Sequence, residues 1–409
     1  MPKDSGGRKT YPDSRPLKKT LRLILRRMAS WGLLAGLLLF IPQSGGSQEA
    51  PAIRIGATVS LSGKFMEPAL MGRDAMKLWE SQVNQRGGLL GRPVKLILYD
   101  DRRNPELARE LYRQLIQKDK VDLIFTPYGS DLSLAALEVT EPHKFVLLVS
   151  ASGDSIWQRG YRHVFGIHAP ARRYLISFLD VIARQGLESV GILYEDSPFN
   201  TAAAQGAADW AKRLGLKIGY FQAYRQGKAE LPRMLPECLV ARPDALILCS
   251  YPEDSYILIG LLKQARRRPK VICQTVAPAL PSFVEKAGDM AEGVFGPSHW
   301  EPDTRIPFPG SKEFIESFKA LAGRPPSYHA SSIYAACQII EKAVSHNRSL
   351  DQEKLRGYIL SLDTVTIIGR FRVDSTGMQV GHNPMLIQWQ QGKKEIVYPT
   401  SMQTAPPRF

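Results

Sequence analysis

The sequence predicts an α/β fold, and three observations carry this prediction. Apolar runs at residues 53–59 and 94–99 have the length of buried strands. Each run is followed by a short turn and then by a segment with helical character. Strands that alternate with helices in this way form a parallel sheet covered on both faces. With 409 residues, 44% of them hydrophobic, the chain is long enough for two cores of ordinary size, so we expect two lobes.

Turn and cap residues define the first helix boundaries. Gly87 and Gly88 follow the first predicted helix, and glycine ends a helix readily because it adopts positive φ without a Cβ clash. Asn104 is a good N-cap for the next helix, Pro105 suits its first position, and Glu106 complements its positive end. Any doubly wound domain uses such signals, so the order of the whole run is the more specific observation.

This run resembles the start of the leucine/isoleucine/valine-binding proteins, the type I periplasmic receptors of ABC importers. The resemblance rests on the turn at 60–63 and on residues 84–93 and 100–108, and it extends over nearly all of residues 52–398. It implies two doubly wound parallel-sheet lobes joined by a three-strand hinge, with one cleft between them. It also implies a periplasmic monomer that binds a small molecule, uses no cofactor and delivers its ligand to an ABC permease in the inner membrane.

The later alternation of strands and helices extends this pattern to the whole chain. We predict a helix at 171–185, a proline-rich return crossing at 292–310, and strands at 369–373, 385–390 and 395–398 that complete the second lobe. The expected boundaries are 52–169 with 300–362 for lobe 1, 170–299 with 363–398 for lobe 2, and 399–409 for a C-terminal tail.

The first 47 residues are predicted to be a signal peptide. A basic region precedes an apolar run at 31–42 and small residues at 44–47. This run is much shorter than the roughly 20 residues of an ordinary membrane span, although an uncleaved anchor is the alternative. We take Met1 as the start, because a start at Met28 would remove the basic residues of the signal.

The net charge of +15 does not indicate a nucleic-acid partner. Residues 1–47 carry +7 of it, which leaves +8 spread over the rest. The densest basic run, Arg266–Arg268 with Lys270, falls where a predicted helix ends, and there it complements the helix dipole. No nucleic-acid-binding motif is present in the sequence, so we expect no such partner.

The four cysteines do not have the spacing of a metal or redox site. They stand at positions 238, 249, 273 and 337, with no Cys-x-x-Cys pair. Cys249 and Cys273 end two apolar runs that we expect on neighbouring strands. An exported protein can join such a pair by a disulfide, and the alternative is two buried free thiols.

The first candidate ligand residues are small and polar. Ser130 follows a predicted strand and begins a helix, where its hydroxyl and nearby N–H groups can face a carboxylate or simply cap the helix. Ser150, Ala151 and Ser152 follow the next strand, at the sheet edge where open α/β folds bind ligands. In the family that the chain resembles, the matching positions hold the carboxylate and the ammonium of an amino acid.

The second group of candidates is aromatic. The resemblance matches Phe199 and Tyr251 to tyrosines with which the second lobe covers the ligand. Trp300 is a candidate wall of the site, or else a buried anchor of the hinge. Phe65, with Met66, follows the turn at 60–63 and is a candidate for the apolar side of the site; simple cover by the loop is the alternative.

One departure from the family pattern concerns the ligand. Amino-acid binders of the family pair the ligand ammonium with an acidic residue after the strand near 270–275, and this chain has Val276 there. A buried ammonium without a charge partner is costly, so an acid or amide without an amino group fits as well as leucine. Four acids are candidate substitutes or ordinary helix caps: Asp131, Asp154, Asp196 and Glu253.

Enzyme functions receive no support from motifs. The sequence has no Gly-x-Ser-x-Gly elbow, no phosphate-binding Gly-x-x-x-x-Gly-Lys loop and no His-Glu-x-x-His. We therefore predict a binding protein without catalytic activity. A receptor that senses a ligand and signals to a regulator without transport is the alternative function.

Overall fold

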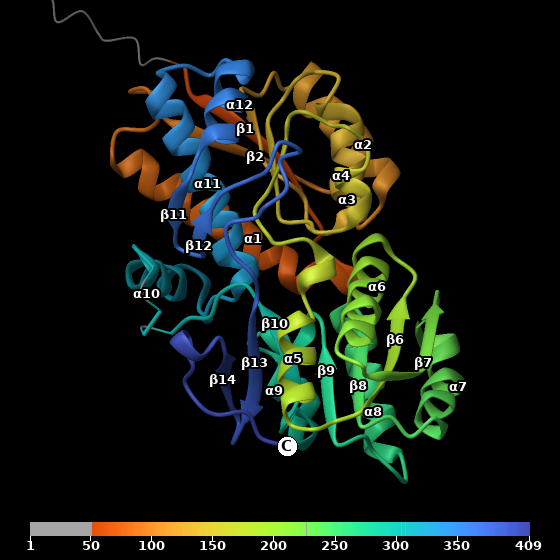
Figure 1. Ribbon diagram of the computed structural model, residues 1–409. Coiled ribbons are helices and arrows are strands. Elements are labelled where there is room, and N and C mark those ends of the chain that lie inside the picture. The colour runs from red at the N-terminus through yellow and green to blue at the C-terminus, as the bar shows by residue number, and fades with distance from the viewer. Residues whose placement is uncertain (1–50, 226, 304, 307) are drawn as a thin grey trace, which may run out of the picture. The chain divides into compact units, whose positions relative to one another are not determined.

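The computed structural model describes residues 51–225, 227–303, 305–306 and 308–409. The predicted signal peptide lies outside these residues. Figure 1 shows helices gathered around two groups of strands, one built mainly from the first third of the chain and the other mainly from its middle. Within the described part, no helix is both long and apolar enough to cross a membrane.

The first group of strands is parallel, as predicted. Strand β1 (Ile53–Val59) lies between β2 (Val94–Asp100) and β3 (Leu123–Ile124), and Ile55 of β1 is in register with Leu96 and Leu123. Strands β4 (Leu147–Val149) and β5 (Val164–Gly166) form a further parallel pair. The helices that follow these strands are α1 (Met66–Gln85), α2 (Pro105–Gln117), α3 (Ser130–Thr140) and α4 (Asp154–Trp157).

The second group is one seven-stranded sheet within the described residues, in the order β14-β13-β10-β9-β8-β6-β7. Its strands are β6 (Ser189–Glu195), β7 (Lys217–Tyr224), β8 (Ala245–Cys249), β9 (Val271–Gln274), β10 (Phe295–Ser298), β13 (Met385–Gln390) and β14 (Lys393–Tyr398). Its helices are α5 (Ile176–Arg184), α6 (Pro198–Arg213), α7 (Gly227–Val240), α8 (Pro252–Gln264) and α9 (Phe283–Ala287). Strands β13 and β14 run antiparallel to their neighbours, so this sheet is parallel only from β10 to β7.

The last third of the chain returns to the first group of strands. Helices α10 (Ser311–Ala322), α11 (Tyr328–Asn347) and α12 (Gln352–Ser361) lead to the hairpin of β11 (Thr364–Thr366) and β12 (Gly369–Phe371). Helices α1 and α11 pack together, and residues of both belong to the largest apolar core. Figure 1 shows α11 and α12 beside β1 and β2 although they lie more than two hundred residues later in the chain.

The predicted caps are confirmed. The side chain of Asn104 accepts hydrogen bonds from the backbone N–H groups of Glu106 and Leu107 at 2.9 and 3.2 Å. Gly87 and Gly88, just after α1, have φ values of 93° and 77°. Asp101, fully buried, accepts hydrogen bonds from Thr58 and Ser60 at 2.7 and 2.6 Å, which ties the carboxyl ends of β1 and β2 together.

Three predicted elements differ from the structure. The crossing predicted at 292–310 begins with strand β10, which pairs with β9 and β13. The predicted strand at 369–373 pairs with β11 as β12 and does not join the seven-stranded sheet, because its apolar residue Phe371 packs in the core beside α11. The helix predicted at 171–185 is a 3₁₀ turn, Ala171–Arg173, followed by α5.

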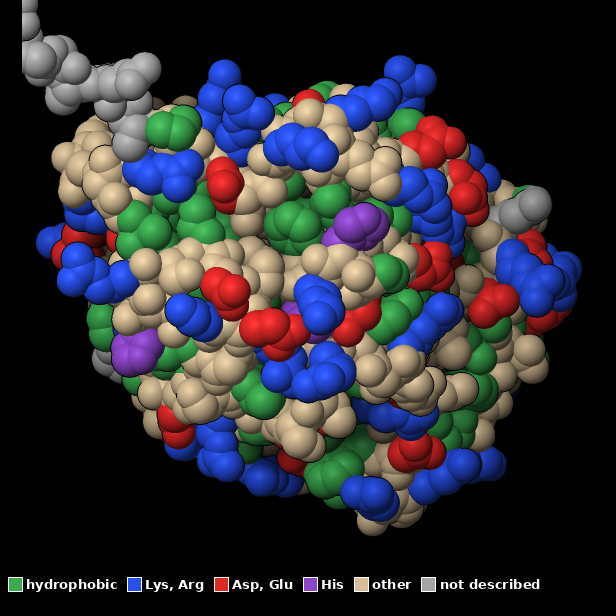
Figure 2. Space-filling model, turned by 90° about the horizontal axis from the view of Figure 1, so that it is seen from above, with side chains coloured by type: hydrophobic (Ala, Val, Ile, Leu, Met, Phe, Trp, Pro, Cys, Tyr) green, Lys and Arg blue, Asp and Glu red, His purple; other side chains and the backbone are tan. Residues whose placement is uncertain are grey.

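The cysteines and the charges also have clear positions. All four cysteines are buried free thiols, so of the two alternatives for Cys249 and Cys273 the structure has the free thiols and no disulfide. In the register of β8 and β9, Cys273 is the partner of Ile247, two residues before Cys249. On the face shown in Figure 2, Lys and Arg side chains are interspersed with acidic ones and form no single basic patch.

Candidate functional site

Six of the eight predicted ligand residues line one cavity. Its volume is about 20 Å³, close to the space that one water molecule needs, so a larger ligand requires the walls to move apart. The walls come from the carboxyl ends of strands in both groups and from the first turns of α3, α6 and α8. The six residues are Ser130, Ser150, Ala151, Ser152, Phe199 and Tyr251.

The three serines supply hydroxyl groups at the N-terminal end of a helix. Ser130 is the first residue of α3, and its Oγ accepts a hydrogen bond from the N–H of Gly153 at 3.1 Å. Ser152 Oγ lies 3.0 Å from the hydroxyl of Tyr174. Ser150 Oγ is buried and has no hydrogen-bond partner among the described residues. A buried hydroxyl without a partner is costly, so Ser150 is available to a ligand.

Aromatic rings form the opposite wall. Phe199, in the first turn of α6, packs edge-on against Tyr174 with ring centroids 5.0 Å apart. Tyr251, the N-cap of α8, packs against Phe65 at 4.6 Å, and Phe65 packs against Tyr128 at 5.3 Å. Phe65 therefore supports the cavity wall from behind, without being among the residues that line it.

Trp300 is located away from this cavity. It is fully buried, its ring packs edge-on against Phe314, and its indole N–H donates to Ser311 Oγ at 3.4 Å. These contacts agree with the second interpretation of Trp300, a buried anchor, which here lies between β10 and α10. Met66 is 42% exposed and does not line the cavity.

Four aromatic residues that the sequence analysis missed also line the cavity. Tyr128 directly precedes Gly129 and Ser130, so its position next to the candidate serine was a usable signal. His168 lies between β5 and the 3₁₀ turn, and Tyr174 follows that turn, inside the helix that was predicted at 171–185. Tyr328 starts α11, far away in sequence, and no local pattern indicated it.

The cavity is polar but carries no net charge at neutral pH. Burial, and to a smaller extent the neighbouring His382, lower the pKa of His168 to about 3, so the imidazole is neutral. Burial raises the pKa values of the Tyr128 and Tyr174 hydroxyls, so both keep their protons. His168 Nε2 lies 2.7 Å from Ser332 Oγ, and its ring stacks on His299 at 4.3 Å.

Val276 lines the same cavity and is almost completely buried. Of the four candidate acids, Asp154 pairs with Arg172, Asp196 with Arg225 and Glu253 with Lys228. Asp131 Oδ1 accepts a hydrogen bond from the N–H of Leu132 at the start of its own helix, and burial raises the pKa of its carboxyl group. None of the four is among the residues that line the cavity.

This arrangement can bind a small anion through hydroxyl and N–H donors. The described residues include no cluster of three or more His, Cys, Asp or Glu side chains that can hold a metal ion. Comparison with known proteins also indicates a binding protein. A family model described as "Periplasmic binding protein" matches residues 52–394.

The chain belongs to the periplasmic binding protein family. Members of this family are exported to the periplasm and bind solutes; they are not enzymes. The predicted type I fold, with two α/β lobes, is confirmed by solved structures of the same architecture.

Three relatives illustrate the similarity. "Leu/Ile/Val-binding protein homolog 7" of Brucella suis is 24% identical over 377 residues, which cover 87% of this chain and 94% of that protein. A leucine-binding protein from Thermotoga maritima aligns with a TM-score of 0.77 at 18% identity, over 84% of this chain and 97% of that one. An ABC transporter solute-binding protein from R. palustris, solved in complex with benzoate, aligns with a TM-score of 0.73 at 18% identity, over 85% and 95%.

Proposed function

We propose that this periplasmic binding protein is the solute-binding component of an ABC importer and that it captures a small carboxylate-bearing ligand. The observation that carries the proposal is the convergence of Ser130, Ser150 and Ser152 on one cavity at the N-terminal end of α3. Hydroxyl groups and the positive end of a helix are favourable partners for a carboxylate. In this proposal Phe199 and Tyr251 cover the ligand, and Ala151 contributes backbone groups.

The mechanism in this proposal is closure of two lobes around the ligand. The predicted lobes are residues 52–169 with 300–362 and 170–299 with 363–398, and the hairpin of β11 and β12, which packs beside α11, extends the first of them. Closure brings the segment after β1 against the lobe of the seven-stranded sheet, and two contacts between these parts support the proposal. Lys64 forms an ion pair with Glu195 at the end of β6, and Glu67 accepts from Lys286 Nζ at 2.7 Å. A ligand that binds the closed form better shifts the population toward it, and the closed form is the one presented to the permease.

The names of the relatives suggest which compounds to test. The relatives include proteins named for leucine, isoleucine and valine and one solved with benzoate. Purified protein, unfolded and refolded to remove bound solute, should be tested by thermal unfolding against branched-chain amino acids, aromatic carboxylates and short amides. At about 100 times the dissociation constant, a true ligand stabilises by roughly 2.7 kcal/mol.

The decisive variant is Ser130→Ala combined with Ser152→Ala. Each hydrogen bond to a charged group contributes about 1.5–3 kcal/mol, so the double variant should bind more than a hundredfold more weakly. The matched control is Ser250→Ala with Ser255→Ala, because these two buried hydroxyls bond to each other at 2.7 Å outside the cavity. Unchanged affinity in the first pair, with folding intact, would refute the site.

A further inference from the structure

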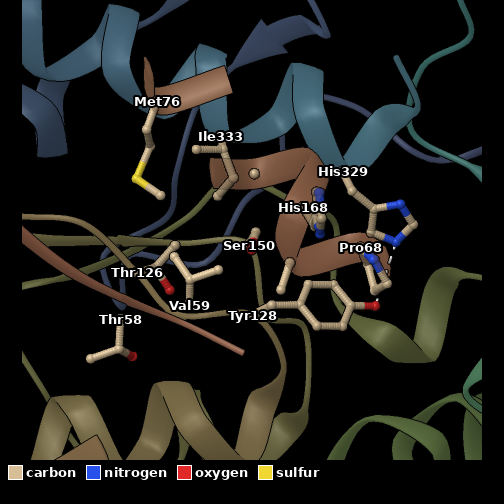
Figure 3. A pocket seen from close by; sticks show the side chains of 12 residues that line it. Thr58, Val59, Pro68, Met76, Thr126, Tyr128, Ser150, His168, His329 and Ile333 are labelled. Carbon is tan, nitrogen blue, oxygen red and sulfur yellow. Dashed lines mark hydrogen bonds between the residues drawn. The ribbon is translucent and has the colours of Figure 1, made fainter. Parts of the chain in front are cut away.

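A second cavity lies beside the first, under helix α1. Its volume is also about 20 Å³, and it shares Tyr128, Ser150 and His168 with the cavity of the serines. Figure 3 shows these three side chains on one side of it and Met76 and Ile333 on another. The apolar part of its lining consists of Val59, Pro68, Ala69, Gly72, Met76 and Ile333.

The two cavities share part of their lining, and the polarity of the lining changes from one cavity to the other. Ser150 Oγ, which has no partner among the described residues, belongs to the walls of both. On the side of the first cavity the lining offers hydroxyls, and on the far side it offers the methyl and thioether groups of α1 and α11. A molecule with a polar head at the serines therefore has an apolar compartment directly behind it.

The apolar compartment is narrow because two helices approach closely at a glycine. A Cβ placed on Gly72 of α1 would lie 3.1 Å from Ile333 Cγ1 of α11. Gly72 and Ala69 leave room on the α1 side, and Ile333 closes the compartment from the α11 side. The side chain of Ile333 is thus the part of the wall whose size limits what fits behind Tyr128 and His168.

Neither cavity offers a negatively charged partner for an ammonium group. The lining of both, as far as the structure describes it, contains no Asp or Glu. Its ionisable nitrogen bases are His168 and His329, and burial lowers the pKa of each, so both are neutral and neither supplies a negative charge. Val276 contributes an apolar side chain to the wall of the first cavity. An ammonium ion held here would be desolvated without a charge partner, which is costly.

From these observations we infer that the ligand is a monocarboxylic acid without an amino group, whose apolar tail enters the compartment between α1 and α11. Ile333 and Gly72 then determine the length and width of the tail. This inference rests on the proposed function, because it takes the serines as the carboxylate site.

The first test compares acids with the amino acids of the same carbon skeleton. Isothermal titration calorimetry should be run on the refolded protein with 4-methylpentanoate against leucine, and with 3-phenylpropanoate against phenylalanine. The amino-free acid of at least one pair should bind on the order of a hundredfold more tightly, since it has no ammonium to desolvate. Leucine or phenylalanine binding as tightly as its acid would overturn the inference but leave the proposed function intact. Failure of all four compounds, with the aromatic carboxylates and amides also inactive, would count against the proposed function itself.

The second test changes the compartment. Ile333→Ala enlarges it, so the ratio of affinities for 3-phenylpropanoate and the smaller 4-methylpentanoate should shift toward the larger acid, by about tenfold or more. Ile340→Ala is the matched control, because Ile340 is a buried isoleucine on the same helix that lines neither cavity. Gly72→Ala narrows the compartment and should shift the ratio the other way. An unchanged ratio in Ile333→Ala and Gly72→Ala, both folded, would overturn the assignment of the tail to this compartment.

Discussion

Gly206 fixes the spacing between α6 and the 3₁₀ turn that precedes Tyr174. A Cβ on Gly206 would lie 2.3 Å from the carbonyl oxygen of Arg172 and 2.4 Å from its Cα. Real Cβ atoms do not approach backbone atoms so closely, so Gly206→Ala requires α6 to move by about an ångström. Because the obstacle is backbone, no rotamer change can relieve it.

The expected magnitude follows from two opposing contributions. Overpacking typically destabilises a protein by about 1–3 kcal/mol, and because the backbone must move here, we expect a cost of about 3 kcal/mol. Alanine gains about 1 kcal/mol over glycine in a helix interior, so the free energy of unfolding should fall by about 2 kcal/mol. Gly357→Ala is the control: this exposed glycine of α12 has no atom within 4 Å of a Cβ, so the same substitution should stabilise by up to about 1 kcal/mol.

Urea denaturation measures both values. The same displacement of α6 should also weaken ligand binding, because Phe199 of α6 and Tyr174 after the turn pack edge-on against each other in the wall of the cavity. If Gly206→Ala were as stable as the wild type, or if both alanine variants changed stability in the same direction, the close-packing argument would be wrong.

Two further predictions concern charge. Burial lowers the pKa values of His168, His299, His329 and His382, the first to about 3, so the unfolded chain binds more protons than the native one below about pH 6.5. The free energy of unfolding should therefore fall as the pH drops from 7 to 4, and His168 alone should contribute up to roughly 1.4 kcal/mol per pH unit; urea denaturation across this range should show a smaller slope in His168→Asn, and an equal slope would contradict the reasoning. Lys64→Met leaves the Glu195 carboxylate, only 8% exposed, without its cation and should cost about 3 kcal/mol at pH 7. Adding Glu195→Gln should restore most of this loss, whereas equal losses in the single and double variants would speak against the ion pair.

Local signals determined the parts of the fold that depend on neighbours in sequence. Asn104, Pro105 and the Gly87-Gly88 pair indicated helix ends because capping involves residues within one turn of each other. The buried strands were recognisable because an apolar run is also a local property of the sequence. Their exact extent was not: β3 covers only Leu123–Ile124 within a longer apolar run, because pairing with β1 and not apolarity sets its length.

The site divides in the same way. Ser130, Ser150, Ala151 and Ser152 were predictable because each follows a strand, and strand ends of a parallel sheet meet at one edge, whereas Phe199 and Tyr251 were indicated by the family resemblance. Tyr174 and Tyr328 reach the same cavity from a turn and from a helix with no distinguishing local pattern. Residues far apart in the chain are brought together only by the packing of α1, α11 and the two sheets, which depends on the shapes of many side chains at once.

The sequence by itself determined the α/β class, the helix caps, the family resemblance and the replacement of an expected acid by Val276. Only the tertiary structure decided that the cysteines are not bonded, that β12 lies outside the seven-stranded sheet and that a second, apolar cavity lies behind the serines. The physical reason is that capping and periodicity are local properties of the backbone. Cavities and registers instead arise from contacts between segments that are hundreds of residues apart, such as Gly72 and Ile333.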